Sequence, residues 1–183
     1  MSVAIDVPAE RVWDELARIG DIGLNSPTVD RSALSSEIAE GIGATRHMEM
    51  SIAKNATLDE RVIAWDEGRS IALEVYEMDG VTGVQTMGGS FAVTTEGDHS
   101  RLTSTLNYSM SNGFFGSMNR LMLKRKFSGL WTSVLAGYKH HIETGEHATT
   151  DTRLDLGAVE LHSIEVDAAP QEQRLTTAPV PTR

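Results

Sequence analysis

Cysteine is absent from the 183 residues of this chain. Disulfide bonds, thiolate metal sites and cysteine nucleophiles are therefore excluded, and the composition fits a reducing compartment. Long apolar runs are missing too, because no uninterrupted stretch of about 18 apolar residues occurs. We expect no stable insertion into a membrane.

Basic residues are also scarce. The chain has 16 Lys and Arg against 26 Asp and Glu, which gives a formal net charge of -10. Nucleic acids and anionic membrane surfaces would be repelled on average, so we expect neither as a partner. Residues 1–8 lack the basic start and the apolar run of a secretory signal, and we expect a cytoplasmic protein.

Aromatic residues make up only 5% of the chain. A core must then be filled by smaller side chains, which leaves room for a void if a sheet is strongly curved. The length suits one domain with a sizeable core and a tail.

The first part of the chain predicts a strand followed at once by a helix. Residues 2–7 form a short, partly β-branched run, and Pro8 suits the first turn of a helix better than a sheet. Apolar residues recur at three- and four-residue spacing over residues 9–19, which indicates an amphipathic helix that ends at Gly20. Residues 21–27 are expected to form a loop or a short second helix.

The middle of the chain alternates between apolar and polar residues, with tight turns rich in Asp and Gly between the runs. Short strands joined in this way predict an antiparallel meander. The predicted strands cover residues 29–38, 45–52, 58–65, 70–78, 84–95 and 101–110.

A long helix is predicted next. No proline interrupts residues 114–144, apolar residues recur there at helical spacing, and Gly145 follows as a C-cap. At about 100° per residue, the apolar stripe of residues 114–122 lies almost opposite that of residues 127–142. We therefore expect a kink near residues 124–129, or two packed helices.

The composition then shifts to Thr, Asp, Ala, Pro and Gln. We expect a domain over residues 1–147 and a polar C-terminal tail over residues 148–183, of which at least the end is flexible. Apolar residues within the tail predict either an extra strand or docking on a partner. These residues are Leu154, Leu156, Val159, Leu161, Ile164 and Val166.

Short segments in this order and spacing resemble the START-like, helix-grip superfamily (SRPBCC), in its polyketide cyclase/dehydrase-like branch. They are IDVPAERVW (5–13), GIGATR (41–46), ERV (60–62), WDEG (65–68), LAGYK (135–139) and ETG (143–145). The resemblance implies an α+β fold in which a curved antiparallel sheet of about six to seven strands wraps around a long C-terminal helix. It also implies a deep apolar cavity between sheet and helix. It does not imply a shared reaction.

Side chains expected to face this cavity are mostly apolar, and Met is soft enough to accept varied ligands. Arg46 shares a strand face with the Met residues, so it is expected either to meet a ligand carboxylate or to pair with Glu60 or Glu74. Tyr108 offers a hydroxyl to a ligand. The candidate ligand-binding residues are Arg46, Met48, Met50, Val62, Leu73, Val75, Phe91, Leu106, Tyr108, Met118, Leu121, Met122 and Trp131.

Catalytic and metal-binding patterns are weak. His47 and Glu49 share one strand face, which suits an acid/base pair or a carboxylate-rich metal site with neighbouring glutamates, but a solvated outer face is the favoured interpretation. Motifs for hydrolases and for nucleotide binding are missing. We predict no metal, no cofactor and no identifiable catalytic residue.

Three functions follow from these patterns. The first is a protein that binds an apolar, lipid-like or polyketide-like molecule in the cavity. The second is a cyclase or dehydrase that uses the same cavity, with at least two ionisable groups facing it. The third is an interaction module with a collapsed cavity, in which residues 149–183 make the contact. A homodimer is compatible with all three.

Overall fold

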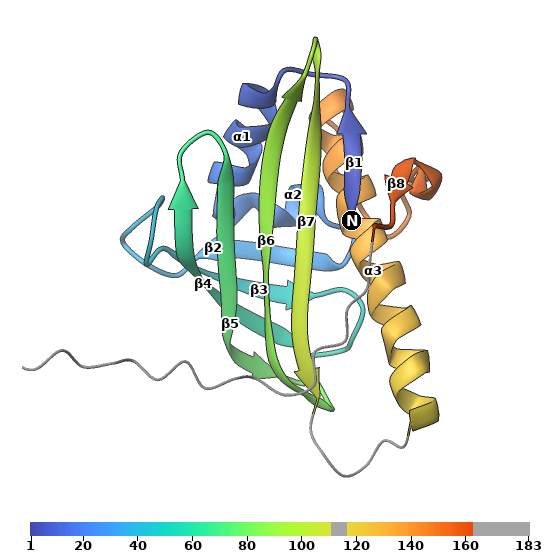
Figure 1. Cartoon of the computed structure of the whole chain (residues 1–183). Coiled ribbons are helices and arrows are strands. Elements are labelled where there is room, and N and C mark those ends of the chain that lie inside the picture. Colours follow the sequence, from blue (N-terminus) through green and yellow to red (C-terminus); the bar gives the residue numbers. More distant parts are fainter. Residues whose placement is uncertain (111–116, 163–183) are drawn as a thin grey trace, which may run out of the picture.

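The computed structural model of the protein describes residues 1–110 and 117–162, with side chains over 1–110 and 124–162. Strands dominate the middle of the chain, and helices lie near both ends (Figure 1). In chain order the elements are β1 (Ser2–Ile5), α1 (Ala9–Ala17), η1 (Ile19–Asp21), α2 (Ile22–Asn25), β2 (Val29–Leu34), β3 (Thr45–Met50), β4 (Thr57–Asp66), β5 (Ser70–Asp79), β6 (Val84–Glu96), β7 (His99–Met110), α3 (Ser117–Thr144), η2 (Leu156–Ala158) and β8 (Val159–Glu160).

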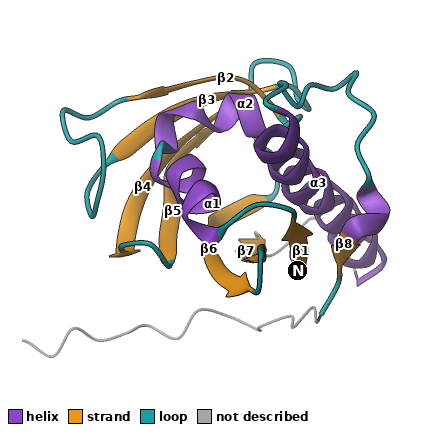
Figure 2. Cartoon of the chain, turned by 90° about the horizontal axis from the view of Figure 1, so that it is seen from above, coloured by secondary structure: helices purple, strands orange, loops and turns teal. Residues whose placement is uncertain are grey.

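The described strands form one antiparallel sheet with the order β2-β3-β4-β5-β6-β7-β1-β8. Seen from above, the strands trace an arc, and α1, α2 and α3 lie on its concave side (Figure 2). This confirms the predicted α+β helix-grip fold. The sheet has eight strands where about six to seven were expected, because residues 159–160 add β8 beside β1.

Helix α1 packs on the sheet through its apolar side, where Val12 and Leu16 are buried. Trp13 meets Trp65 of β4 edge to face, with ring centroids 5.0 Å apart. Both indole N–H groups donate to the carboxylate of Glu67. The helix ends at Ala17 rather than near residue 19, because the chain tightens there into the 3-10 turn η1.

Helix α3 is one continuous helix, so the predicted alternative of two packed helices is wrong. That prediction assumed that the whole helix packs on one surface. Instead, the described core contacts lie in the C-terminal half, where Leu135, Tyr138 and Ile142 are buried. Residues 124–133 are half-buried or exposed, so their apolar side chains need not lie on the same face of the helix as those of the buried C-terminal half. No helix in the described ranges is long and apolar enough to cross a membrane.

The chain continues along the domain after α3. The N–H of Ala148, which is buried, donates to the carbonyl of Leu24 at 3.0 Å, and β8 pairs with β1. Arg101 of β7 holds Glu160 at 3.1 Å. The apolar residues of the tail had been predicted either to form an extra strand or to dock on a partner. Residues 159–160 form an extra strand. The last fifteen or so residues, which were predicted to be flexible, lie outside the described residues.

Candidate functional site

A small cavity lies on the inner face of the sheet, between the strands and α3. Its volume is about 20 Å³, which is room for about one water molecule. The resemblance implied a deep cavity, whereas the described side chains nearly fill this one. Every strand from β3 to β7 contributes to its wall, and so does α3. The lining residues are Arg46, Glu60, Leu73, Met87, Gly88, Gly89, Phe91, Leu106 and Trp131.

An ion pair forms the polar part of this wall. Arg46 and Glu60 are register partners on β3 and β4, and their side chains are 5% and 14% exposed. Nε of Arg46 donates to Oε2 of Glu60 at 2.8 Å, and Nη2 donates to the same oxygen. Nη1 donates to the carbonyl of Ile19 at 2.9 Å. Arg46 had been expected either to meet a ligand carboxylate or to pair with Glu60 or Glu74. In the structure it forms a salt bridge with Glu60.

Tyr138 of α3 adjoins this ion pair. Burial raises the pKa of its hydroxyl to about 12, although the positive charge of Arg46 and a hydrogen bond with it act in the opposite direction. The nearby carboxylates of Glu60 and Glu15 also favour the protonated form. The hydroxyl therefore stays neutral at physiological pH and adds no charge to the cluster.

Another part of the wall is aromatic. The rings of Phe91 and Trp131 lie 5.8 Å apart, and Phe91 also meets Tyr138 at 5.5 Å. Nε1 of Trp131 donates to Oγ of Ser104 at 3.1 Å, and that hydroxyl donates to the carbonyl of Ser90 at 2.9 Å. Because these polar atoms bond to one another, they leave an apolar surface toward the cavity.

Two glycines of β6 give the wall a stretch of bare backbone. A Cβ at Gly88 would lie 2.8 Å from the carbonyl oxygen of Leu73, and one at Gly89 would lie 2.7 Å from that of Thr105. Neither position accepts a side chain unless a neighbouring strand shifts. A glycine inside a strand often marks such a close approach of backbone.

The structure brings five of the predicted residues to the cavity: Arg46, Leu73, Phe91, Leu106 and Trp131. Met48 and Val62 are buried in the core, and Met50 and Val75 pack against it, so these four support the site from outside its lining. Tyr108 stacks on Phe127 of α3 with ring centroids 4.7 Å apart and does not line the cavity. The side chains of Met118, Leu121 and Met122 lie outside the described residues.

Four lining residues and one neighbour were missing from the predicted set. Glu60 had been considered as a salt-bridge partner of Arg46 or as a member of an acid/base or metal site with His47, but not as a cavity residue. Met87 had been noted only as one of several methionines, and no role in ligand binding was predicted for Gly88 and Gly89. Tyr138 could have been found, since it places one hydroxyl in the apolar stripe of the long helix. The glycines carry no such signal, because their effect depends on how closely the strands approach.

The outer face of the sheet carries the His47 and Glu49 pattern. Nδ1 of His47 lies 2.9 Å from Oδ1 of Asp59, and Glu49 lies 3.5 Å from Arg31, an exposed partner. These contacts agree with the favoured interpretation as a solvated face. In residues 1–110 and 117–162, no three His, Cys, Asp or Glu side chains gather closely enough to hold a metal ion.

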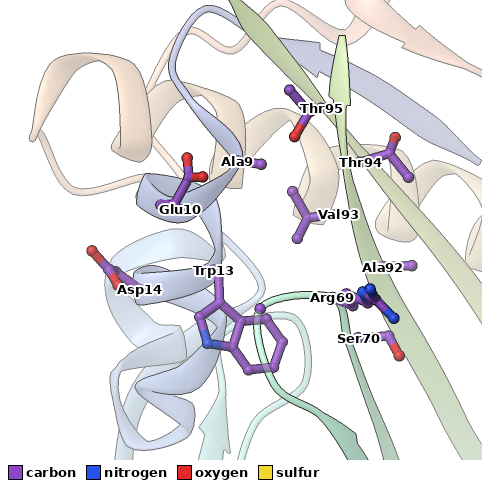
Figure 3. A pocket seen from close by; sticks show the side chains of 11 residues that line it. Ala9, Glu10, Trp13, Asp14, Arg69, Ser70, Ala92, Val93, Thr94 and Thr95 are labelled. Atoms are coloured by element: carbon purple, nitrogen blue, oxygen red, sulfur yellow. The ribbon is translucent and has the colours of Figure 1, made fainter.

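A larger hollow lies between α1 and the adjoining ends of β5 and β6 (Figure 3). It measures about 690 Å³ and is open to solvent, with Glu10 and Asp14 on the helix side and Arg69 and Thr94 across from them. None of the predicted site residues lines it. We place the candidate site at the inner cavity despite its smaller volume, because it lies between the sheet and α3, where the resemblance implies a cavity, and because five of the predicted residues line it.

A comparison with protein-family models matches residues 1–143 to the family described as polyketide cyclase/dehydrase and lipid transport. The chain belongs to this family. The match ends close to the end of α3, so β8 and the rest of the C-terminal extension lie beyond the part that the family shares. No curated protein sequence matches the chain.

Solved structures show the same fold in proteins of low sequence identity. TTHA0849 from Thermus thermophilus has a TM-score of 0.65 at 19% identity, covering 78% of this chain and 94% of that one. XoxI from Bacillus cereus has a TM-score of 0.62 at 17% identity, covering 80% and 96%. Ara h 8.0201 has a TM-score of 0.57 at 11% identity, covering 78% and 94%. At these identities the likeness concerns the fold alone.

Proposed function

We propose that this member of the polyketide cyclase/dehydrase and lipid transport family binds a largely apolar, lipid-like or polyketide-like small molecule between its sheet and α3. The observation that carries the proposal is the inner cavity, whose wall is apolar except for one buried ion pair. Burial of apolar surface would provide most of the affinity, at roughly 25 cal/mol per Å². The Arg46–Glu60 pair would orient the ligand.

The cavity must expand to hold such a molecule. Met87 and Leu106 are only partly buried, and methionine adapts its shape easily. Residues 124–133 of α3 are also less buried than residues 134–142, so this half of the helix is the less costly one to displace. Both features support entry of the ligand beside the N-terminal half of α3.

Native mass spectrometry of the purified protein, followed by denaturation and extraction, tests the proposal. We expect the native mass to exceed the chain mass by that of a small molecule, and the extract to contain an apolar compound. As a control, the denatured protein should show the chain mass alone. An empty protein that also fails to bind fatty alcohols, fatty acids and aromatic polyketides would contradict the proposal and favour the interaction module.

A cyclase or dehydrase is the second candidate, and one observation favours it. Two ionisable groups, Arg46 and Glu60, line the cavity, and the neutral hydroxyl of Tyr138 lies beside them. Their mutual salt bridge holds both charges together, however, and neither is poised as a free base. The extraction separates the two functions, since a binding protein returns its ligand unchanged and an enzyme given a polyketide returns a product.

A further inference from the structure

The ion pair in the cavity wall leaves one hydrogen-bonding position open. Both Arg46 donors end on Oε2 of Glu60, and no described residue donates to Oε1. Oε1 is a strong, charged acceptor, and the Glu60 side chain keeps 14% of its surface exposed, so a donor from outside the protein can reach it. A ligand that brings a donor would satisfy it.

The charge of the site is already balanced. The guanidinium of Arg46 is committed to Glu60 and to the carbonyl of Ile19, and Tyr138 is neutral. Glu15, on α1, adds a further carboxylate close enough to act on the Tyr138 hydroxyl. A ligand carboxylate would therefore be desolvated beside Glu60 without an uncommitted cation to pair with.

The remaining wall offers no competing polar contact within the described residues. The side chains of Leu73, Met87, Phe91 and Leu106 are apolar, and the indole N–H of Trp131 is already bonded to Ser104. Among the side chains that the structure describes in this wall, Glu60 is therefore the acceptor open to a polar group of a ligand.

We propose that the Arg46–Glu60 pair makes the site selective for apolar molecules that carry a neutral hydrogen-bond donor, such as a hydroxyl, over carboxylates. This inference rests on the proposed function. The hydroxyl donates to Oε1 of Glu60 while the ion pair stays intact. The apolar body of the ligand fills the water-sized cavity and pushes its lining residues apart. Glu60 is thus the residue that determines specificity.

Three probes of similar chain length separate the effects of apolar burial, hydrogen-bond donation and negative charge in the wild-type protein. They are decanol, methyl decanoate and ionised decanoate. Each competes with the neutral fluorophore N-phenylnaphthylamine at mildly alkaline pH. Methyl decanoate is neutral and cannot donate, so it controls for apolar burial. We expect decanol to bind roughly tenfold more tightly than either of the others, the ratio expected for one hydrogen bond to a charged acceptor.

The variant Glu60→Gln tests the charge balance. It leaves Arg46 without a carboxylate partner, so the affinity for decanoate should rise roughly tenfold relative to the affinity for decanol. The matched control is Glu74→Gln, which alters the Arg61–Glu74 pair on the exposed face of β4 and β5 and should leave the ratio unchanged. If Glu60→Gln does not fold, the comparison of decanol with methyl decanoate still decides the donor requirement.

The outcomes separate the inference from the function on which it rests. Equal binding of decanol and methyl decanoate, or tighter binding of decanoate by the wild-type protein, would overturn the selectivity and leave the ligand-binding function standing. Failure of the fluorophore and of every probe to bind would overturn both.

Discussion

Replacing Gly137 with alanine is expected to lower the free energy of unfolding by roughly 3 kcal/mol or more. A Cβ at this position of α3 would lie 2.3 Å from the carbonyl oxygen of Asn25, 3.0 Å from Cδ of Pro27 and 3.2 Å from Cβ of Ala148. Its neighbours include backbone on α2, so no side-chain rotation relieves the overlap. Urea unfolding followed by circular dichroism measures the change.

Gly129→Ala is the matched control on the same helix. Nothing lies within 4 Å of a Cβ at this exposed position, and alanine favours the helix by roughly 1 kcal/mol over glycine. The control should therefore raise the free energy of unfolding. If both variants changed stability equally and in the same direction, the close packing of α3 on α2 at Gly137 would be wrong.

The second large effect is expected for Glu60→Leu, which should cost roughly 3 to 5 kcal/mol of folding free energy. The loss arises because Arg46, 5% exposed in its side chain, keeps its charge without a carboxylate to balance it. Differential scanning calorimetry and urea unfolding would both report the change. The same replacement at an exposed ion pair, Glu74→Leu, should cost less than roughly 1 kcal/mol.

The double variant Arg46→Met, Glu60→Leu distinguishes a lost charge partner from lost packing. With both charges removed, much of the stability should return, apart from the cost of the Ile19 carbonyl that loses its donor. A double variant as unstable as Glu60→Leu alone would show that the carboxylate acts through packing and would argue against an unbalanced, buried cation.

Patterns of period two and 3.6 were enough to predict most of the strands, α1 and the long helix, whereas the fold was implied by the resemblance of short segments to the helix-grip superfamily. Strand faces could be predicted as well, since Arg46 and Met48 are buried while His47 contacts the outer-face Asp59. Local pattern left open two packed helices in place of α3, because a stripe shows which residues are apolar but not which surface each half of the helix meets. It also left β8 undecided, since two residues beside β1 have no periodicity of their own.

The site was predicted only in part, for similar physical reasons. The expected cavity residues included Leu73, Phe91 and Leu106, which do line it, and alternation placed Arg46 on the same strand face as Met48 and Met50. The sequence left the partner of Arg46 open between Glu60 and Glu74, because the choice depends on which strand lies beside β3 and in which register. The neighbour is β4, on which Glu60 faces Arg46, whereas Glu74 lies on β5. The volume of the cavity depends on how all the walls pack, and no single residue encodes it.

We place the ligand in the inner cavity rather than in the open hollow beside α1. The most direct test compares the affinities of two variants for N-phenylnaphthylamine. Leu106→Asp changes the cavity wall, and its control, Ile63→Asp, changes an exposed residue of β4. With both variants shown to be folded by circular dichroism, we predict at least roughly tenfold weaker binding for Leu106→Asp, because a carboxylate would enter the apolar wall, and unchanged binding for Ile63→Asp. Unchanged affinity in a folded Leu106→Asp protein would contradict this placement and put the ligand elsewhere.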